Sequence, residues 1–171
     1  FVTIESVIEP EEPVRPRLSL AQALVKGDRM DLIIQKATEL GVYRIIPVIA
    51  DRSDVRLDAE RSARRIERWR RIEVEAAKQC ERLTLPTVEV PTRLRDLLEA
   101  SVEPIVALVE RDAAPIRNVL RELGQPESVT LVVGPEGGWS EDEGRMFEQS
   151  NAHCASLGRG ILRAETAAIA G

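Results

Sequence analysis

Hydrophobic and polar residues alternate along this chain with two different periods. Between Asp28 and Gly41 the apolar positions recur every three or four residues, which predicts an amphipathic helix with Asp28 as its N-cap and Gly41 as its stop. Residues 44–50 are a short apolar run rich in isoleucine, which is typical of a strand buried on both faces of a parallel sheet. A shorter apolar alternation covers residues 18–25.

Helical and strand patterns continue to alternate toward the C-terminus. A long helix is expected over residues 58–82, ended by Pro86, with one apolar stripe and arginines on its other faces. The remaining expected elements are strands at residues 88–90, 105–109, 129–133 and 155–157, and helices at residues 114–123, after Thr92, after Trp139 and from near residues 163–166. This order predicts an α/β fold with a mostly parallel sheet flanked by crossover helices.

Two glycine-rich loops lie near the C-terminus, each between an expected strand and an expected helix. The first, residues 134–140, ends on Ser140, which forms a capping-box pattern with Glu143. The second is Gly158-Arg159-Gly160. Ligands in open α/β sheets bind beyond the carboxyl ends of the strands, so the two loops predict the walls of one pocket. Either loop alone could equally make a tight turn, but two together favour a ligand site.

The spacing of these loops argues against several other chemistries. The first loop lacks the Lys-Ser/Thr pair of a phosphate-binding P-loop, and neither loop has the glycine spacing of a dinucleotide site. A GxSxG nucleophile elbow is absent as well, so the single histidine, His153, is expected to be a surface or hydrogen-bonded side chain.

Composition bounds the remaining possibilities. A chain of 171 residues that is 43% hydrophobic is long enough for one compact domain. Its formal net charge of -5 disfavours a dedicated nucleic-acid binder, so any RNA contact must rest on local patches. Two distant cysteines and one histidine indicate neither a metal site nor a disulfide framework. Without an apolar span or signal segment, we expect a cytoplasmic protein that contacts no membrane.

Five segments form a series of motifs in the chain. They are residues 35–42 (QKATELGV), Arg52-Ser53, residues 75–82 (EAAKQCER), residues 134–138 (GPEGG) and residues 157–168 (LGRGILRAETAA). In order and spacing this series resembles the motifs of the bacterial small-subunit (16S) rRNA uridine-N3 methyltransferases (RsmE type) of the SPOUT superfamily. The resemblance covers the chain from about Leu24 to its end, and the last two motifs together are highly specific.

The resemblance implies a domain organisation and partners. Residues 18–171 would be a SPOUT methyltransferase domain whose C-terminal segment forms a deep trefoil knot, a rare exception to the rule against threaded chains. Residues 1–17, rich in proline and glutamate, would be a linker or remnant of a missing N-terminal PUA-like domain. Members of the family are homodimers that act on ribosomal RNA, and we expect parts of the native protein to be missing at both ends of this chain.

The resemblance also implies an S-adenosylmethionine site within the knot. Its residues would be Leu108, Val109, Glu110, Val133, Gly134, Pro135, Glu136, Gly137, Gly138, Leu157, Gly158, Ile161, Leu162, Arg163 and Thr166. The uridine N3 atom is a poor nucleophile until its proton leaves. We therefore expect Arg163 to stabilise negative charge on the uracil oxygens, and Glu165 to take the proton or to order the loop.

Arginines are the other feature of interest. Glutamates interspersed along residues 58–82 indicate that most arginines of this helix form a solvated face. Arg52 and Arg82 lie inside family-like motifs at the ends of elements, so we expect them to contact RNA phosphates. Cys80 is expected to pack on the helix stripe, and Trp139 to cover the cofactor loop or simply to pack.

Three alternatives stay open at this point. The chain could be another SPOUT methyltransferase that acts on tRNA or on a ribose 2′-hydroxyl. It could be a non-catalytic RNA-binding module of the same fold, or an unrelated α/β ligand-binding protein whose glycines only make turns.

Overall fold

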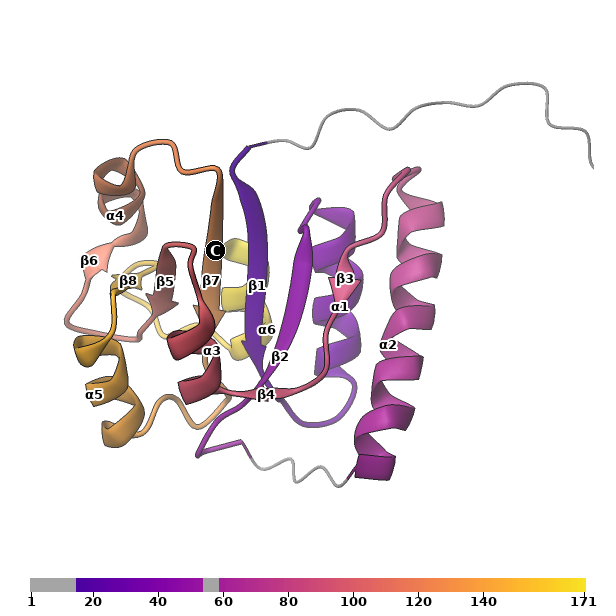
Figure 1. The fold of residues 1–171 in the computed structure, drawn as a ribbon, viewed down its shortest axis with the longest axis horizontal. Coiled ribbons are helices and arrows are strands. Elements are labelled where there is room, and N and C mark those ends of the chain that lie inside the picture. Colours follow the sequence, from indigo (N-terminus) through magenta and orange to yellow (C-terminus); the bar gives the residue numbers. More distant parts are fainter. Residues whose placement is uncertain (1–14, 54–58) are drawn as a thin grey trace, which may run out of the picture.

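The computed structural model describes residues 15–53 and 59–171 of the chain. The elements in chain order are β1 (Arg17–Ala23), α1 (Arg29–Glu39), β2 (Arg44–Ile49), α2 (Ala59–Gln79), β3 (Thr87–Val88), β4 (Thr92–Arg93), α3 (Leu94–Ala100), β5 (Ile105–Leu108), β6 (Ala114–Pro115), α4 (Ile116–Leu123), β7 (Ser128–Val133), α5 (Glu141–Gln149), β8 (Ala152–Ser156) and α6 (Ala164–Ala170). The strands form an eight-stranded sheet in the order β3-β2-β1-β7-β5-β8-β6, with β4 paired to β2 (Figure 1). The pairings of these described strands are parallel, which confirms the predicted sheet.

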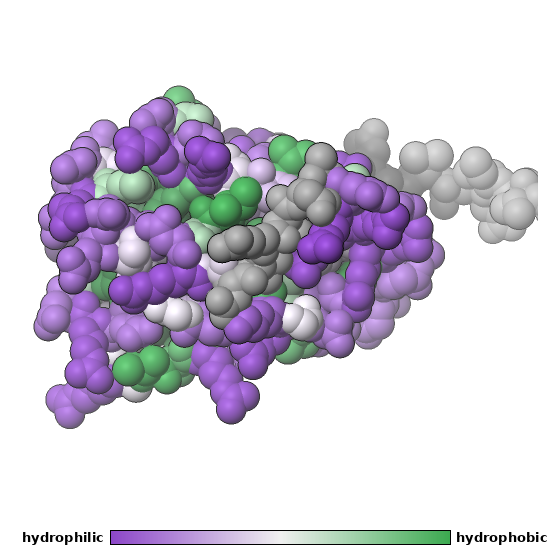
Figure 2. Space-filling view, turned by 90° about the horizontal axis from the view of Figure 1, so that it is seen from below, coloured by the Kyte–Doolittle hydropathy of each residue, from purple (hydrophilic) through white to green (hydrophobic). Residues whose placement is uncertain are grey.

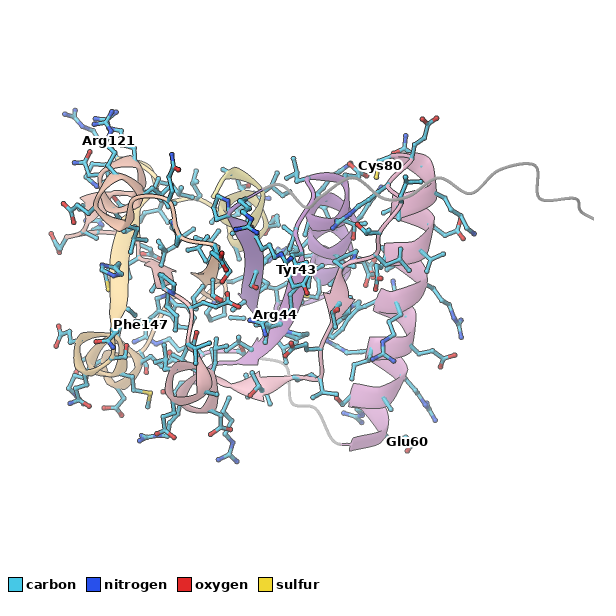
Figure 3. All side chains as sticks on the ribbon, turned by 45° about the horizontal axis from the view of Figure 1, so that its top comes forward. Tyr43, Arg44, Glu60, Cys80, Arg121 and Phe147 are labelled. Carbon is cyan, nitrogen blue, oxygen red and sulfur yellow. The ribbon has the colours of Figure 1, made fainter. Side chains whose placement is uncertain are left out.

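Consecutive residues of the central strands enter two different cores, one on each face of the sheet. Leu20 and Leu131 belong to the larger core, which α1, α2, α4 and α6 cover. Ala21 and Val132 belong to the smaller core, which α3 and α5 cover and which contains the buried Phe147 of α5 (Figure 3). Burial on both faces explains why β2 and β5 read as near-continuous apolar runs, and each large aliphatic side chain so buried contributes about 1.5–3 kcal/mol.

Several element boundaries differ from the sequence prediction. Ala114 and Pro115 form β6, so the helix expected from residue 114 begins at Ile116, and β8 begins at Ala152 and not at residue 155. The helix α2 ends at Gln79, several residues before Pro86, because Glu81 adopts a left-handed φ of 58° and the Arg82 amide donates to the Ala77 carbonyl oxygen at 2.9 Å. Thr92 does not open a helix: it pairs with β2 as part of β4, and α3 begins two residues later.

Other predictions fall partly outside the described residues. Residue 58, the expected start of the long helix, lies outside the described residues. Residues 1–14 of the expected linker lie outside them as well, so the linker assignment stays a prediction. Arg17, the last residue of that linker, is the first residue of β1. None of the described helices is long and apolar enough to cross a membrane.

The parallel arrangement places the carboxyl ends of the strands along one edge of the sheet. The loops that follow β1, β2, β5, β7 and β8 therefore gather at this edge, at the bottom of Figure 1. After β8 the chain runs back along the edge, and α6 packs against α1 and β7. The trefoil knot that the resemblance implies stays a prediction.

Candidate functional site

A cavity of about 740 Å³ opens at the carboxyl edge of the sheet. Its walls are residues 108–110, 133–140, 157–158 and 160–164, together with Arg29, Arg52, Gly144 and Ala167. Figure 2, which views the molecule from this end, shows apolar residues framed by hydrophilic ones. The two glycine-rich loops thus face one space, and a cavity of this size lies within the range of about 300–1,000 Å³ typical of small-molecule sites.

The loop after β7 is a tight turn that leads into a capped helix. Gly138 has a φ of 67°, and its amide donates to the Pro135 carbonyl oxygen at 3.0 Å. The Ser140 side chain then accepts a bond from the Glu143 amide at 3.1 Å, while the Glu143 carboxylate accepts from the Ser140 amide at 2.8 Å. The predicted capping box is confirmed, and it fixes where the loop ends.

Trp139 forms part of the cavity wall and also packs against the smaller core. Its indole Nε1 donates to the Leu108 carbonyl oxygen at 2.9 Å, and its ring meets Phe147 edge-on at 5.1 Å. A side chain on Gly134 would approach the indole ring to 3.2 Å, so glycine at this position allows the loop to lie close to the tryptophan.

The loop after β2 is fastened to the same turn. The buried Glu143 carboxylate accepts from the Asp51 amide at 2.9 Å, and Ser140 Oγ donates to the Asp51 carboxylate at 2.6 Å. Arg52 donates to the Gly137 carbonyl oxygen at 3.1 Å. The buried Glu143 carboxylate therefore joins the loop after β2 to the loop after β7. This connection places Arg52 at the rim of the cavity.

The loop after β8 presents a different surface. Residues 158–163 are exposed, and Gly158 has a φ of 146°, a conformation that favours glycine. Ile161 and Leu162 line the cavity yet leave 57% and 40% of their surface exposed. Arg163 precedes the first turn of α6 and is exposed at the cavity wall.

The cavity wall contains charged side chains of both signs. Glu110 and Glu136 belong to the wall, as do Arg29, Arg52 and Arg163. Charges of both signs therefore face the cavity, which suits a ligand that itself carries both. Within the described residues, no cluster of histidine, cysteine and acidic side chains could hold a metal ion.

Comparison with known proteins identifies the family. The family model described as RNA methyltransferase domain matches residues 10–171. The chain belongs to this RNA methyltransferase family. A curated relative, the ribosomal RNA small subunit methyltransferase E of Bacillus subtilis, is 35% identical over 161 residues, which are 90% of this chain and 62% of the relative.

Solved members of the family share the fold. A Legionella pneumophila protein solved in complex with S-adenosylmethionine is 36% identical, with a TM-score of 0.86 over 94% of this chain and 65% of that one. The Neisseria gonorrhoeae ribosomal RNA small subunit methyltransferase E, bound to S-adenosylmethionine, is 34% identical, with a TM-score of 0.81 over 90% and 62% of the two chains. The fold is also that of a SpoU methyltransferase from Streptomyces viridochromogenes, which is 17% identical, with a TM-score of 0.56 over 92% of this chain and 57% of that one. These likenesses confirm the predicted fold class. The chain spans a little under two thirds of these relatives' lengths.

The methyltransferase fold brings most of the predicted cofactor residues together. All of them except Thr166 line the cavity, although their segments are far apart in the sequence. Thr166 is exposed on α6 and lies outside the wall. Glu165, one of the two predicted catalytic residues, is not among the wall residues, and its Oε1 is 3.9 Å from Arg29 Nε.

The two predicted RNA contacts lie in different surroundings. Arg52 is on the cavity rim, whereas Arg82 is half-buried beyond the end of α2, where it donates to the Thr38 carbonyl oxygen at 3.0 Å. Burial lowers the pKa of the Arg82 guanidinium, an effect that nearby Cys80 and Glu73 oppose. In this structure Arg82 fastens α2 to α1.

Sequence reasoning missed several residues of the cavity wall. Arg29, Gly144, Ala164 and Ala167 belong to this wall. The last two lie inside the motif of residues 157–168 and could have been found there. Arg29 could not be found in this way, because its partner Glu136 lies 107 residues away in the sequence.

Proposed function

We propose that this chain is an S-adenosylmethionine-dependent methyltransferase that methylates N3 of a uridine in small-subunit ribosomal RNA. The observation that carries the proposal is the cavity between the two glycine-rich loops, whose wall contains nearly all the residues expected to bind the cofactor. The solved relatives that bind S-adenosylmethionine share this fold over most of the chain.

The cavity suits the chemistry of S-adenosylmethionine. Leu108, Val133 and Leu157 supply apolar surface for an aromatic base. Glycines in the loop after β7 let a ligand approach the backbone, whose amides and carbonyls can hold polar groups. Glu110 and Glu136 can accept hydrogen bonds from hydroxyl or ammonium groups. When bound, S-adenosylmethionine supplies an electrophilic methyl group on a sulfonium centre.

Two side chains are assigned to the transfer step. Arg163, exposed at the cavity wall, stabilises the negative charge that forms on the uracil oxygens, and loss of such a donor costs about 3–4 kcal/mol. Glu165 takes the N3 proton. Its Oε2 is buried and has no hydrogen-bond partner among the described residues, so it retains the capacity to accept one.

Ribosomal RNA and a second copy of the chain are the partners in this proposal. Arg52, at the rim and 3.1 Å from the Gly137 carbonyl oxygen, is in position to contact a phosphate of RNA that reaches the cavity. The exposed Ile161, Leu162 and Ile169 support a homodimer, because each leaves more than a third of an apolar surface uncovered. The expected compartment is the cytoplasm, where ribosomal RNA is modified.

Calorimetric titration with S-adenosylhomocysteine, the demethylated product, tests the cofactor site. Gly137→Val is the disruptive variant, because its Cβ would lie 3.1 Å from the Arg52 Cβ, so the loop after β2 would have to shift to admit the valine. Ala100→Val, exposed at the end of α3, is the control. We expect binding by wild type and control and a large loss for Gly137→Val. A folded wild-type chain that binds nothing would contradict the proposal.

Mapping of the modified nucleotide tests the acceptor. We expect 3-methyluridine in small-subunit ribosomal RNA that has been incubated with the protein and S-adenosylmethionine. A ribose-methylated product, or methylated tRNA, would show instead that the chain is another methyltransferase of the same fold class. RNA binding that is unchanged by the cofactor and gives no product would favour a non-catalytic module.

A further inference from the structure

Arg29 connects two parts of the cavity that are remote in the sequence. It is the first residue of α1, and its Nη1 lies 2.7 Å from Glu136 Oε1 in the loop after β7. The same carboxylate oxygen accepts a hydrogen bond from the Lys26 amide at 3.0 Å. The loop after β1 and the loop after β7 are thereby joined through one carboxylate.

The other side of the guanidinium faces Glu165. Arg29 Nε is 3.9 Å from Glu165 Oε1, and the Glu165 side chain is only 14% exposed. Arg29 and Glu136 are more open, at 45% and 29%. Glu165 follows the exposed loop 158–163 by two residues, so this contact holds the start of α6 in place.

The charges explain why an arginine suits this position. Glu136 and Glu165 are both carboxylates that face one guanidinium, and a cation between them offsets their repulsion. The guanidinium presents several donors in a rigid plane, so it can face two carboxylates at once, whereas a lysine presents one ammonium group. Burial of Glu165 strengthens the effect, because water screens a buried charge less.

We infer that Arg29 is a positioning residue that ties Glu136 of the cofactor loop to Glu165 of α6, and so couples cofactor binding to the transfer step. The inference rests on the proposed function, in which Glu165 takes the uridine proton. Arg29 acts on that step through Glu165 and on cofactor binding through Glu136.

Three variants of Arg29 and its surroundings separate this role from general stability. Arg29→Met removes the charge but keeps the length of the side chain, and Arg29→Lys restores the charge. Arg68→Met is the matched control, because Arg68 pairs with Asp28 at 3.1 Å beside the same helix and does not line the cavity. Hydrogen exchange of the cofactor-free chain should rise at the amides of residues 136–138 and 164–168 with Arg29→Met and remain unchanged with Arg68→Met.

Methyl-transfer kinetics test the coupling. We expect Arg29→Met to lower kcat by about tenfold or more, since small displacements of a catalytic group cost this much, and to raise the KM for S-adenosylmethionine. In the Glu165→Gln background, Arg29→Met should still raise this KM but should not lower kcat further. Arg29→Lys should recover part of both effects.

Two results would overturn the role of Arg29. One is a kcat for the double variant that is the product of the two single effects, since Arg29 would then act independently of Glu165. The other is an equal effect of Arg68→Met. These results leave the proposed function intact if the wild-type chain binds S-adenosylhomocysteine. A wild-type chain that does not bind it refutes the proposed function and the coupling together.

Discussion

The loop after β7 is braced on several sides, whereas the loop after β8 is held only at its ends. Trp139, Arg29 and Arg52 each bond the first loop or a residue within it to another part of the wall, and Glu143 closes it against α5. In the second loop, residues 158–163 are exposed, and none of their side chains forms a hydrogen bond or an ion pair with the described part of the chain.

This difference suggests different tasks for the two loops. The bonds of the first loop exist without a ligand, so its backbone groups are preorganised and little order must be gained on binding. The second loop carries Ile161 and Leu162 in the open, and a ligand or a partner would order it. In the proposed reaction, the first loop holds the cofactor, and the second closes over it and presents Arg163.

Among the variants that test this difference between the loops, removal of the Glu143 carboxylate should have the largest effect on stability. Glu143→Ala leaves the amides of Asp51 and Ser140 without their acceptor in a buried site, so we expect the free energy of unfolding to fall by about 2–4 kcal/mol. Urea unfolding measures the change. Glu148→Ala, exposed on the same helix, should change it by less than about 0.5 kcal/mol. Equal effects of the two variants would show that the hydrogen bonds of Glu143 contribute nothing to the free energy of unfolding.

A smaller loss of stability is expected when only one hydrogen bond of the loop after β7 is removed. Trp139→Phe keeps an aromatic ring against Phe147 but removes the indole donor to the Leu108 carbonyl oxygen, which should cost about 1–2 kcal/mol. Titration with S-adenosylhomocysteine should show weaker binding as well, because Leu108 is part of the wall. Unchanged stability and affinity would mean that the indole bond does not hold the loop.

Local features of both loops could be predicted from the sequence, while the contacts between walls could not. Ser140 and Glu143 are three residues apart, so the capping box is visible as a pattern. The partners of Arg29 and Arg52 lie 107 and 85 residues away in the sequence. Hydrophobic periodicity predicts which elements form, but it says nothing about which long polar side chains meet at the edge of the sheet.

The same reasoning explains the boundary of α2 and the place of Thr166. The left-handed residue Glu81 ends the helix, and glutamate is not a typical residue for that conformation, so Pro86 was the stronger signal. Thr166 lies within a cofactor motif, but the period of α6 turns it away from the cavity that Ala164 and Ala167 face.

Gly158 and Gly160 test how rigidly the loop after β8 is held. Gly158→Ala places a side chain at a φ of 146°, which should cost about 1 kcal/mol. Gly160→Ala meets nothing within 4 Å and should change stability by less than about 0.5 kcal/mol. Thermal unfolding of the two variants side by side measures the difference. Equal stabilities would indicate that the loop is free enough to relax the strain at Gly158.

The smallest effect is expected at Glu73, a second buried carboxylate. Comparison of Glu73 with Glu143 tests whether the stability that Glu143 contributes comes from its hydrogen bonds or from its burial. Burial raises the pKa of Glu73 above its ordinary value of 4.5, against the opposing charges of Arg70 and Arg82. The folded state therefore binds the proton more tightly than the unfolded state. The resulting stability is complete below the ordinary pKa and is lost as the pH rises through the folded-state pKa.

Glu73→Gln should therefore raise the free energy of unfolding slightly at pH 7, by less than about 1 kcal/mol, because it removes a charge that burial disfavours. The gain should shrink as the pH falls through the raised folded-state pKa of Glu73 and should be absent below 4.5, where the wild-type carboxyl is itself protonated. Urea unfolding at several pH values measures both. At Glu143, whose oxygens accept bonds from two backbone amides, the same substitution should destabilise the fold at neutral pH. Destabilisation of similar size at both positions would mean that the Glu143 bonds add nothing specific to the cofactor loop.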